Sequence, residues 1–174
     1  MESAETEDKV KPGRAAPAHP PSPDHEQDEY GWLLHQAGLL RAGRLGEVDR
    51  ASLAEFLTGM AGTHRSTFRS AMTVLLHHLL KVRVQPKRLT RSWLLTIRTQ
   101  QQDARFVMEE NPGMRQHLPE LHAKAYAEAR HRASIETGTA LGRFPESNPW
   151  TLDEALAFVP PDPPPRTRRA VQRG

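Results

Sequence analysis

A proline separates two apolar helical patterns near the middle of the chain, within residues 72–101. Before Pro86, leucines recur at the three- and four-residue spacing of a helix face, and Trp93, Leu94 and Ile97 continue this spacing after it. Because proline lacks a backbone N–H and disfavours helical geometry in the preceding residue, the first helix must end here. The sequence therefore predicts a helical hairpin whose two apolar faces meet.

The same periodicity, with capping residues and breakers, predicts further helices on both sides of the hairpin. We expect helices at 28–43, 49–84, 90–111, 119–138 and 151–158. An unbroken second helix would be about 54 Å long at 1.5 Å per residue, and Gly59 and Gly62 are the alternative break points. No segment alternates with the two-residue period of a strand. The predicted fold is all-α, an antiparallel helical bundle of four to five helices with an extended C-terminal strap over residues 141–158.

Helical spacing also predicts which faces are buried. The first helix has its main apolar face at Tyr30, Leu33, Leu34, Ala37 and Leu40, with a second side at Trp32 and Leu39. The second helix carries one stripe formed by His64, Phe68, Ala71, Leu75, Leu79 and Val82. The third is predicted to bury Trp93, Ile97, Ala104 and Met108, with Gln101 as a polar exception.

Both ends of the chain differ from the middle in composition. Residues 1–27 are acidic and rich in proline, and residues 159–174 are rich in proline and arginine. We predict two disordered arms around a helical domain at 28–158, because the arms contain too few apolar residues to offset the entropy cost of ordering. Residues 1–29 have a net charge of −5 and residues 163–174 a net charge of +4.

The charge of the middle is concentrated around the hairpin. No acidic residue lies between Glu55 and Asp103, whereas eight basic residues do. The candidate contacts for an anionic partner are Lys81, Arg83, Lys87, Arg88, Arg91 and Arg98. Such a cluster could contact phosphates of a nucleic acid, and Trp93 could stack on a base. The alternatives are solvated charges at helix ends and a core tryptophan. The acidic arm could screen this cluster, so deleting residues 1–27 should raise binding to an anionic partner at low salt.

Signatures of catalysis and metal binding do not occur in the sequence. It has no cysteine, and its nine histidines form no H-E-x-x-H spacing, although His64, His78 and His122 could converge inside the bundle. Its adjacent carboxylate pairs point to different parts of a helix surface. We therefore expect no catalytic, cofactor or metal site. The favoured function is a non-enzymatic interaction module with a protein partner or self-association. The alternatives are a nucleic-acid-binding protein using the basic hairpin, or an enzyme or metal protein whose site assembles from distant residues.

The longest apolar runs are far shorter than the roughly 20 residues that cross a bilayer. The first residues are acidic and lack the basic and apolar regions of a signal peptide. We expect a cytoplasmic protein without a membrane partner.

A series of short strings occurs in a characteristic order and spacing over residues 30–158. They are YGWLLHQAGLLRAGR, HHLLK before Gln85-Pro86, TRSW, Glu136-Thr137-Gly138, Phe144-Pro145-Glu146 and Pro149-Trp150-Thr151-Leu152. This ordered set resembles the bacterial domain-of-unknown-function family 29. The resemblance implies a helical fold and a bacterial, cytosolic origin. The family carries no agreed activity, so the resemblance assigns no catalytic residue.

Overall fold

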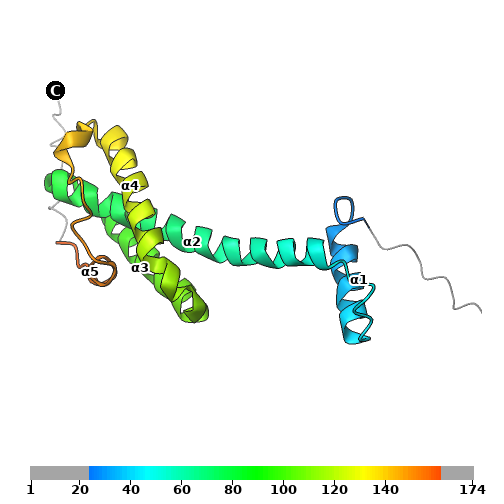
Figure 1. The fold of residues 1–174 in the computed structure, drawn as a ribbon. Coiled ribbons are helices and arrows are strands. Elements are labelled where there is room, and N and C mark those ends of the chain that lie inside the picture. Colours follow the sequence, from blue (N-terminus) through cyan, green and yellow to red (C-terminus); the bar gives the residue numbers. More distant parts are fainter. Residues whose placement is uncertain (1–23, 162–174) are drawn as a thin grey trace, which may run out of the picture. The chain divides into compact units, whose positions relative to one another are not determined.

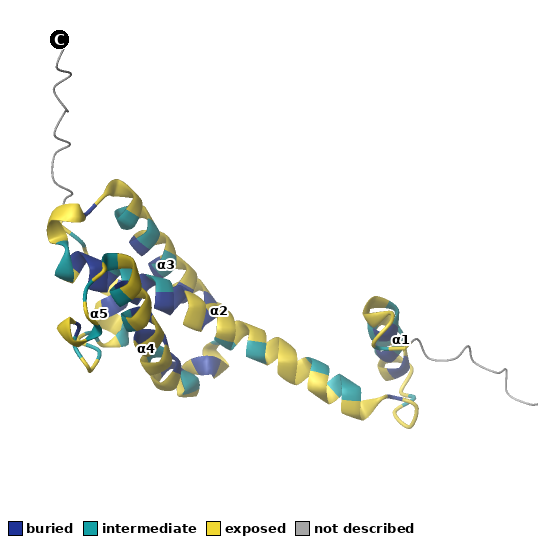
Figure 2. Cartoon of the chain, turned by 90° about the horizontal axis from the view of Figure 1, so that it is seen from above, coloured by how far each residue is buried: buried dark blue, intermediate teal, exposed yellow. Residues whose placement is uncertain are grey.

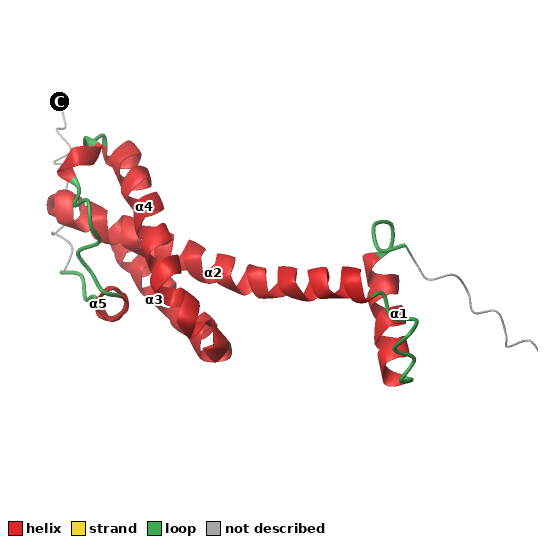
Figure 3. Cartoon of the chain, viewed as in Figure 1, coloured by secondary structure: helices red, strands yellow, loops and turns green. Residues whose placement is uncertain are grey.

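A computed structural model describes residues 24–161 of the chain, and most of the two predicted arms lies outside this range. Within it the chain forms five α-helices and three short 3₁₀ helices and no strand (Figures 1 and 3), which confirms the all-α prediction. In chain order the elements are α1 (Glu29–Arg41), α2 (Arg50–Val84), η1 (Pro86–Arg88), α3 (Arg91–Glu110), η2 (Pro112–His117), α4 (Leu118–Thr137), η3 (Leu141–Arg143) and α5 (Leu152–Ala157). The described residues divide into two compact units, with the boundary between Glu55 and Phe56.

The first unit contains α1 and the loop that follows it. Asp28 caps α1 by accepting a hydrogen bond from the Gly31 amide at 2.8 Å. The buried residues of α1 are Trp32, Gln36 and Leu39. Gln36 is satisfied because its side-chain oxygen accepts from the Asp49 amide at 2.9 Å.

The face of α1 predicted to be the main apolar face is the more exposed one. Tyr30, Leu34 and Leu40 are exposed, and the predicted second side is the one that the structure buries. Periodicity locates two apolar sides on this helix but does not say which of them meets a partner.

The predicted helix boundaries of the second unit follow from local chemistry. α2 ends at Val84, before Pro86 opens η1, and Thr90 caps α3 by accepting from the Trp93 amide at 3.3 Å. Gly138 ends α4 with a φ of 65°, a left-handed conformation that glycine adopts without steric cost. At α5, Thr151 and Glu154 form a reciprocal capping box.

α2 is one continuous helix through Gly59 and Gly62, so the unbroken alternative is the one observed. Its residues 56–67 are exposed or half-buried, whereas most residues from Phe68 to Val82 are buried (Figure 2). His64 was predicted on the buried stripe, but it is exposed because the stripe is covered only from Phe68 onward.

One core joins the covered half of α2 to α3 and α4. Its fully buried side chains include Leu75, Leu79 and Ile97. α4 contributes Ala125, Ala129 and Ala133, all with 0% exposure, and these small side chains allow close helix approach. On α3 the predicted burial holds for Ile97 and Ala104, while Trp93 and Met108 are only partly buried.

Hydrogen bonds from α3 and α4 hold the segment after α4 against the core. Gln101 donates to the carbonyls of Ala155 at 3.1 Å and Phe158 at 2.9 Å, and this explains a buried polar residue on an apolar face. The Tyr126 hydroxyl donates to the Pro145 carbonyl at 2.6 Å. Polar side chains of two helices thus position α5 and the turns before it.

Candidate functional site

Five of the six predicted anion-contacting residues are exposed. Arg83 lies in the last turn of α2, Lys87 and Arg88 in η1, and Arg91 at the start of α3. Arg98 lies seven residues after Arg91, about two turns along the same side of α3. Arg88 donates a 3.4 Å hydrogen bond to Gln85, and none of the five forms an ion pair with a carboxylate in residues 24–161. We call these five exposed residues the basic turn.

Lys81, the sixth predicted residue, does not lie on this surface. It is 3% exposed, forms an ion pair with Glu136 of α4, and its Nζ lies 4.1 Å from the centroid of the Trp93 ring. Position 81 faces the neighbouring helices, so the ammonium is satisfied internally by a carboxylate and an aromatic face. The prediction that Lys81 contacts an external anion is therefore wrong, because its ammonium is buried and already paired. The contact with Lys81 places the Trp93 ring on the side of α3 that packs against the core.

Lys81 belongs to a charge cluster whose lysine is buried and whose carboxylate, Glu136, is half exposed. His77 Nε2 lies 2.7 Å from the Glu136 carboxylate, but burial lowers the pKa of His77 to about 4. Burial also lowers the pKa of His78, whose Nδ1 lies 3.0 Å from the Val74 carbonyl oxygen. Burial opposes ionisation of Glu136, yet the hydrogen bond and charge of Lys81 hold the pKa of that carboxyl below its usual value. The cluster joins three helices electrostatically.

The histidines that could have converged are separate. His64 is exposed, His78 makes an edge contact with Trp93, and His122 Nε2 lies 3.0 Å from Asn148 Nδ2. Across residues 24–161, no group of three or more histidine, aspartate or glutamate side chains is placed to hold a metal ion.

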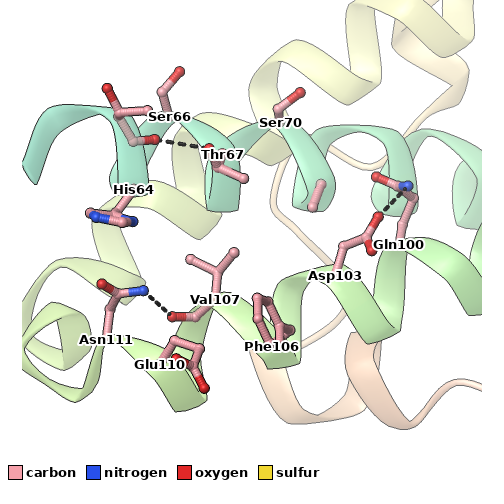
Figure 4. Close-up of a pocket in the computed structure, with 12 residues that line it drawn as sticks. His64, Ser66, Thr67, Ser70, Gln100, Asp103, Phe106, Val107, Glu110 and Asn111 are labelled. Carbon is pink, nitrogen blue, oxygen red and sulfur yellow. Dashed lines mark hydrogen bonds between the residues drawn. The ribbon is translucent and has the colours of Figure 1, made fainter. Parts of the chain in front are cut away.

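An open groove of about 840 Å³ lies between α2 and α3 in the second unit (Figure 4). One wall is the α2 segment from Thr63 to Ala71, which presents small side chains and His64. The opposite wall is the last half of α3, from Gln100 to Glu110, with Phe106 projecting into the groove. We call this feature the α2/α3 groove.

Its chemistry combines an apolar floor with an acidic rim. Phe106 is 64% exposed, which is unusual for a large aromatic side chain inside a folded unit. The lining includes the carboxylates of Asp103 and Glu110 and no lysine or arginine. The hydroxyls of Thr63 and Thr67 donate to the backbone carbonyls four residues earlier in α2, so they need no further partner.

Sequence reasoning missed this groove because neither wall carries a motif. Thr63, Ser66, Thr67 and Ser70 appear in the sequence as an ordinary polar helix face. The one available signal was Phe106, an aromatic residue that lies off the predicted apolar stripe of its helix. Only the packing of α3 across α2 brings these residues together.

A family model described as "Domain of unknown function DUF29" matches residues 25–159. No curated protein and no solved structure shows significant similarity to the chain. None of the helices in the described range has the length and apolar content needed to span a bilayer.

Proposed function

The chain belongs to the DUF29 family, and we propose that it is a non-enzymatic interaction module that binds a helical segment of another protein in the α2/α3 groove. The observation that carries this proposal is the exposed Phe106 beside a wall of small side chains and a rim of carboxylates. A helix with leucine-like residues on one side and lysine or arginine on its flanks has the complementary chemistry.

The dimensions of the groove support a helical occupant. The α3 wall from Gln100 to Glu110 spans about 15 Å at 1.5 Å per residue, which matches roughly three turns of a partner helix. The small residues on the α2 wall would allow a partner backbone to approach closely. Phe106 would then lose most of its exposed area, as an aromatic anchor at the centre of an interface does.

The carboxylates of the groove determine which charge the flanks of a partner helix should carry. Asp103 and Glu110 line the groove, and no lysine or arginine does, although the chain as a whole has a net charge of +3. Asp103 accepts a 3.0 Å hydrogen bond from Gln100. A partner with basic flanks gains attraction at this rim, and one with acidic flanks is repelled.

The test uses a fluorescent helical peptide of about four turns, with leucines on one side and lysines on both flanks. We expect Phe106→Ser to weaken binding about tenfold or more, because it removes the aromatic anchor. Leu95→Ser is the matched control, since Leu95 is 67% exposed on α3 but does not line the groove. Equal losses in both variants, or no loss in either, would contradict the proposal. Self-association that Phe106→Ser abolishes, measured by sedimentation, would assign the groove to a second copy instead.

A second candidate function is nucleic-acid binding through the basic turn. It is favoured by the five exposed cations that lack a carboxylate partner within residues 24–161. Such residues can replace counterions along a phosphate backbone, so binding should fall steeply as salt rises.

The corresponding measurement is anisotropy of a labelled DNA duplex at low and at physiological salt. Lys87→Glu with Arg88→Glu should weaken binding several-fold at low salt, because it reverses two charges at the centre of the basic turn. Binding that is indifferent to both salt and these substitutions would rule this candidate out.

A further inference from the structure

A second cavity in the same unit lies between the middle of α2 and the beginning of α4. Its volume is about 500 Å³, and its lining includes Arg65, Ser66 and Arg69 from α2. The start of α4 contributes Lys124 and Glu120, and His117 lies at the junction with η2. Three basic side chains and one acidic one give this lining an excess of positive charge.

The acid and one of the bases already neutralise each other. Lys124 forms an ion pair with Glu120 one turn earlier in α4. The pKa of Glu120 is lowered chiefly by the hydrogen bond and charge of Lys124, and less by the charges of His117 and Arg65. Arg65 and His117 line the same cavity, and neither forms an ion pair with this carboxylate.

The two arginines are left without partners. Neither the Arg65 nor the Arg69 guanidinium makes a hydrogen bond or an ion pair with any residue in the described part of the chain. They are four residues apart on one helix, so both emerge on the same face roughly 6 Å apart. A Cβ built on Gly62 would stand 3.9 Å from Arg65 Nη2, so this guanidinium lies beside the glycine.

We propose that this cavity, lined by Arg65, Ser66, Arg69 and His117, binds a phosphomonoester. A guanidinium presents its N–H groups as a fork that matches two phosphate oxygens, and two such forks on adjacent helical turns match a tetrahedral dianion. The Ser66 hydroxyl and the His117 ring supply further donors on opposite sides of the cavity. The volume exceeds that of a phosphate ion, so an attached organic group fits beside it.

This site is separate from the α2/α3 groove in its chemistry and in its test. Ser66 lines both, but the basic residues lie only on the phosphate side and Asp103 and Glu110 only on the groove side. Failure of peptide binding in the groove therefore leaves the phosphate site untouched.

The experiment is calorimetric titration of the full chain with glycerol 3-phosphate at constant ionic strength. Arg65→Gln with Arg69→Gln should weaken binding by at least about tenfold, because it removes two charge-assisted contacts. The matched control is Lys87→Gln with Arg88→Gln, which removes the same charge from the exposed basic turn. Thermal unfolding of both double variants verifies that they are folded.

Two further arms identify the source of the phosphate. Inorganic phosphate alone should bind more weakly than glycerol 3-phosphate if the attached group also contacts the cavity. A phosphoserine peptide is compared with the same peptide without the phosphate group. If the phosphorylated peptide binds more tightly than glycerol 3-phosphate and the unphosphorylated one does not bind, the site is assigned to a phosphorylated protein. Equal weakening by both double variants would mean general charge attraction only and would overturn the proposal, as would the absence of binding by every phosphate probe.

Discussion

Lys81 shows how a single residue can be predicted in the right segment and assigned to the wrong environment. The sequence places it in a run of cations with no acid nearby, but its partner Glu136 is 55 residues away along the chain. Its second contact, the Trp93 ring at 4.1 Å, is equally invisible to local patterns. Replacing Glu136 would leave the buried Lys81 ammonium without its carboxylate partner, so this contact is a point of sensitivity in the fold.

The pH dependence of stability follows from His77 and His78 at this cluster and from His122 on α4. Burial lowers the pKa of His77 from 6.5 to about 4, and it also lowers those of His78 and His122. Because these rings take up protons more readily in the unfolded chain, their stabilisation is complete above pH 6.5 and is lost as the pH falls, in the case of His77 toward pH 4. His77 contributes a slope of at most about 1.4 kcal/mol per pH unit within that window.

We therefore expect the midpoint of thermal unfolding to fall between pH 7 and pH 5. His77→Gln should flatten this dependence, because glutamine does not titrate. His131→Gln is the control, since His131 is an exposed residue of the same helical unit. An unchanged slope in His77→Gln would show that this ring does not drive the pH dependence.

At the scale of elements, α2 matters because it continues beyond the core that covers it. Its uncovered segment provides a wall of the α2/α3 groove and the two arginines of the phosphate cavity. Gly59 lies in the same uncovered segment, just before the residues that line both proposed sites. Residue 59 lies in open space, where an added Cβ would meet no atom within 4 Å.

Gly59→Ala should stabilise the chain by about 0.5–1 kcal/mol, since alanine loses less backbone entropy than glycine in a helix. Gly43→Ala should destabilise it by about 1 kcal/mol, because Gly43 has a φ of 70°. Denaturant unfolding of the two variants measures both effects. Destabilisation by Gly59→Ala would contradict a continuous helix at that position.

Helix ends were predictable from the sequence because they depend on local chemistry. Pro86, Thr90, Gly138 and Thr151 act through their own backbone or a neighbour three residues away. Burial was predictable only where one apolar stripe dominates, as in α2 from Phe68 onward. It failed in α1, where two apolar sides compete and tertiary packing decides between them.

At the scale of the whole molecule, the net charge of +3 conceals surfaces of opposite sign. The unit from Phe56 onward combines an acidic groove, a basic turn and a cavity with unpaired arginines. The basic turn can be proposed from the sequence because most of its residues lie close together along the chain. The groove and the cavity cannot, since each joins residues from helices that only the fold brings together.

The central claim is that the α2/α3 groove selects a helix by its apolar side and its basic flanks. A charge-swap titration tests it most directly, using Asp103→Lys with Glu110→Lys against the lysine-flanked peptide and its glutamate-flanked counterpart. The double variant should lose affinity for the basic peptide about tenfold or more and gain affinity for the acidic one, because the attraction at the rim is reversed. Unchanged affinity for both peptides would contradict the claim.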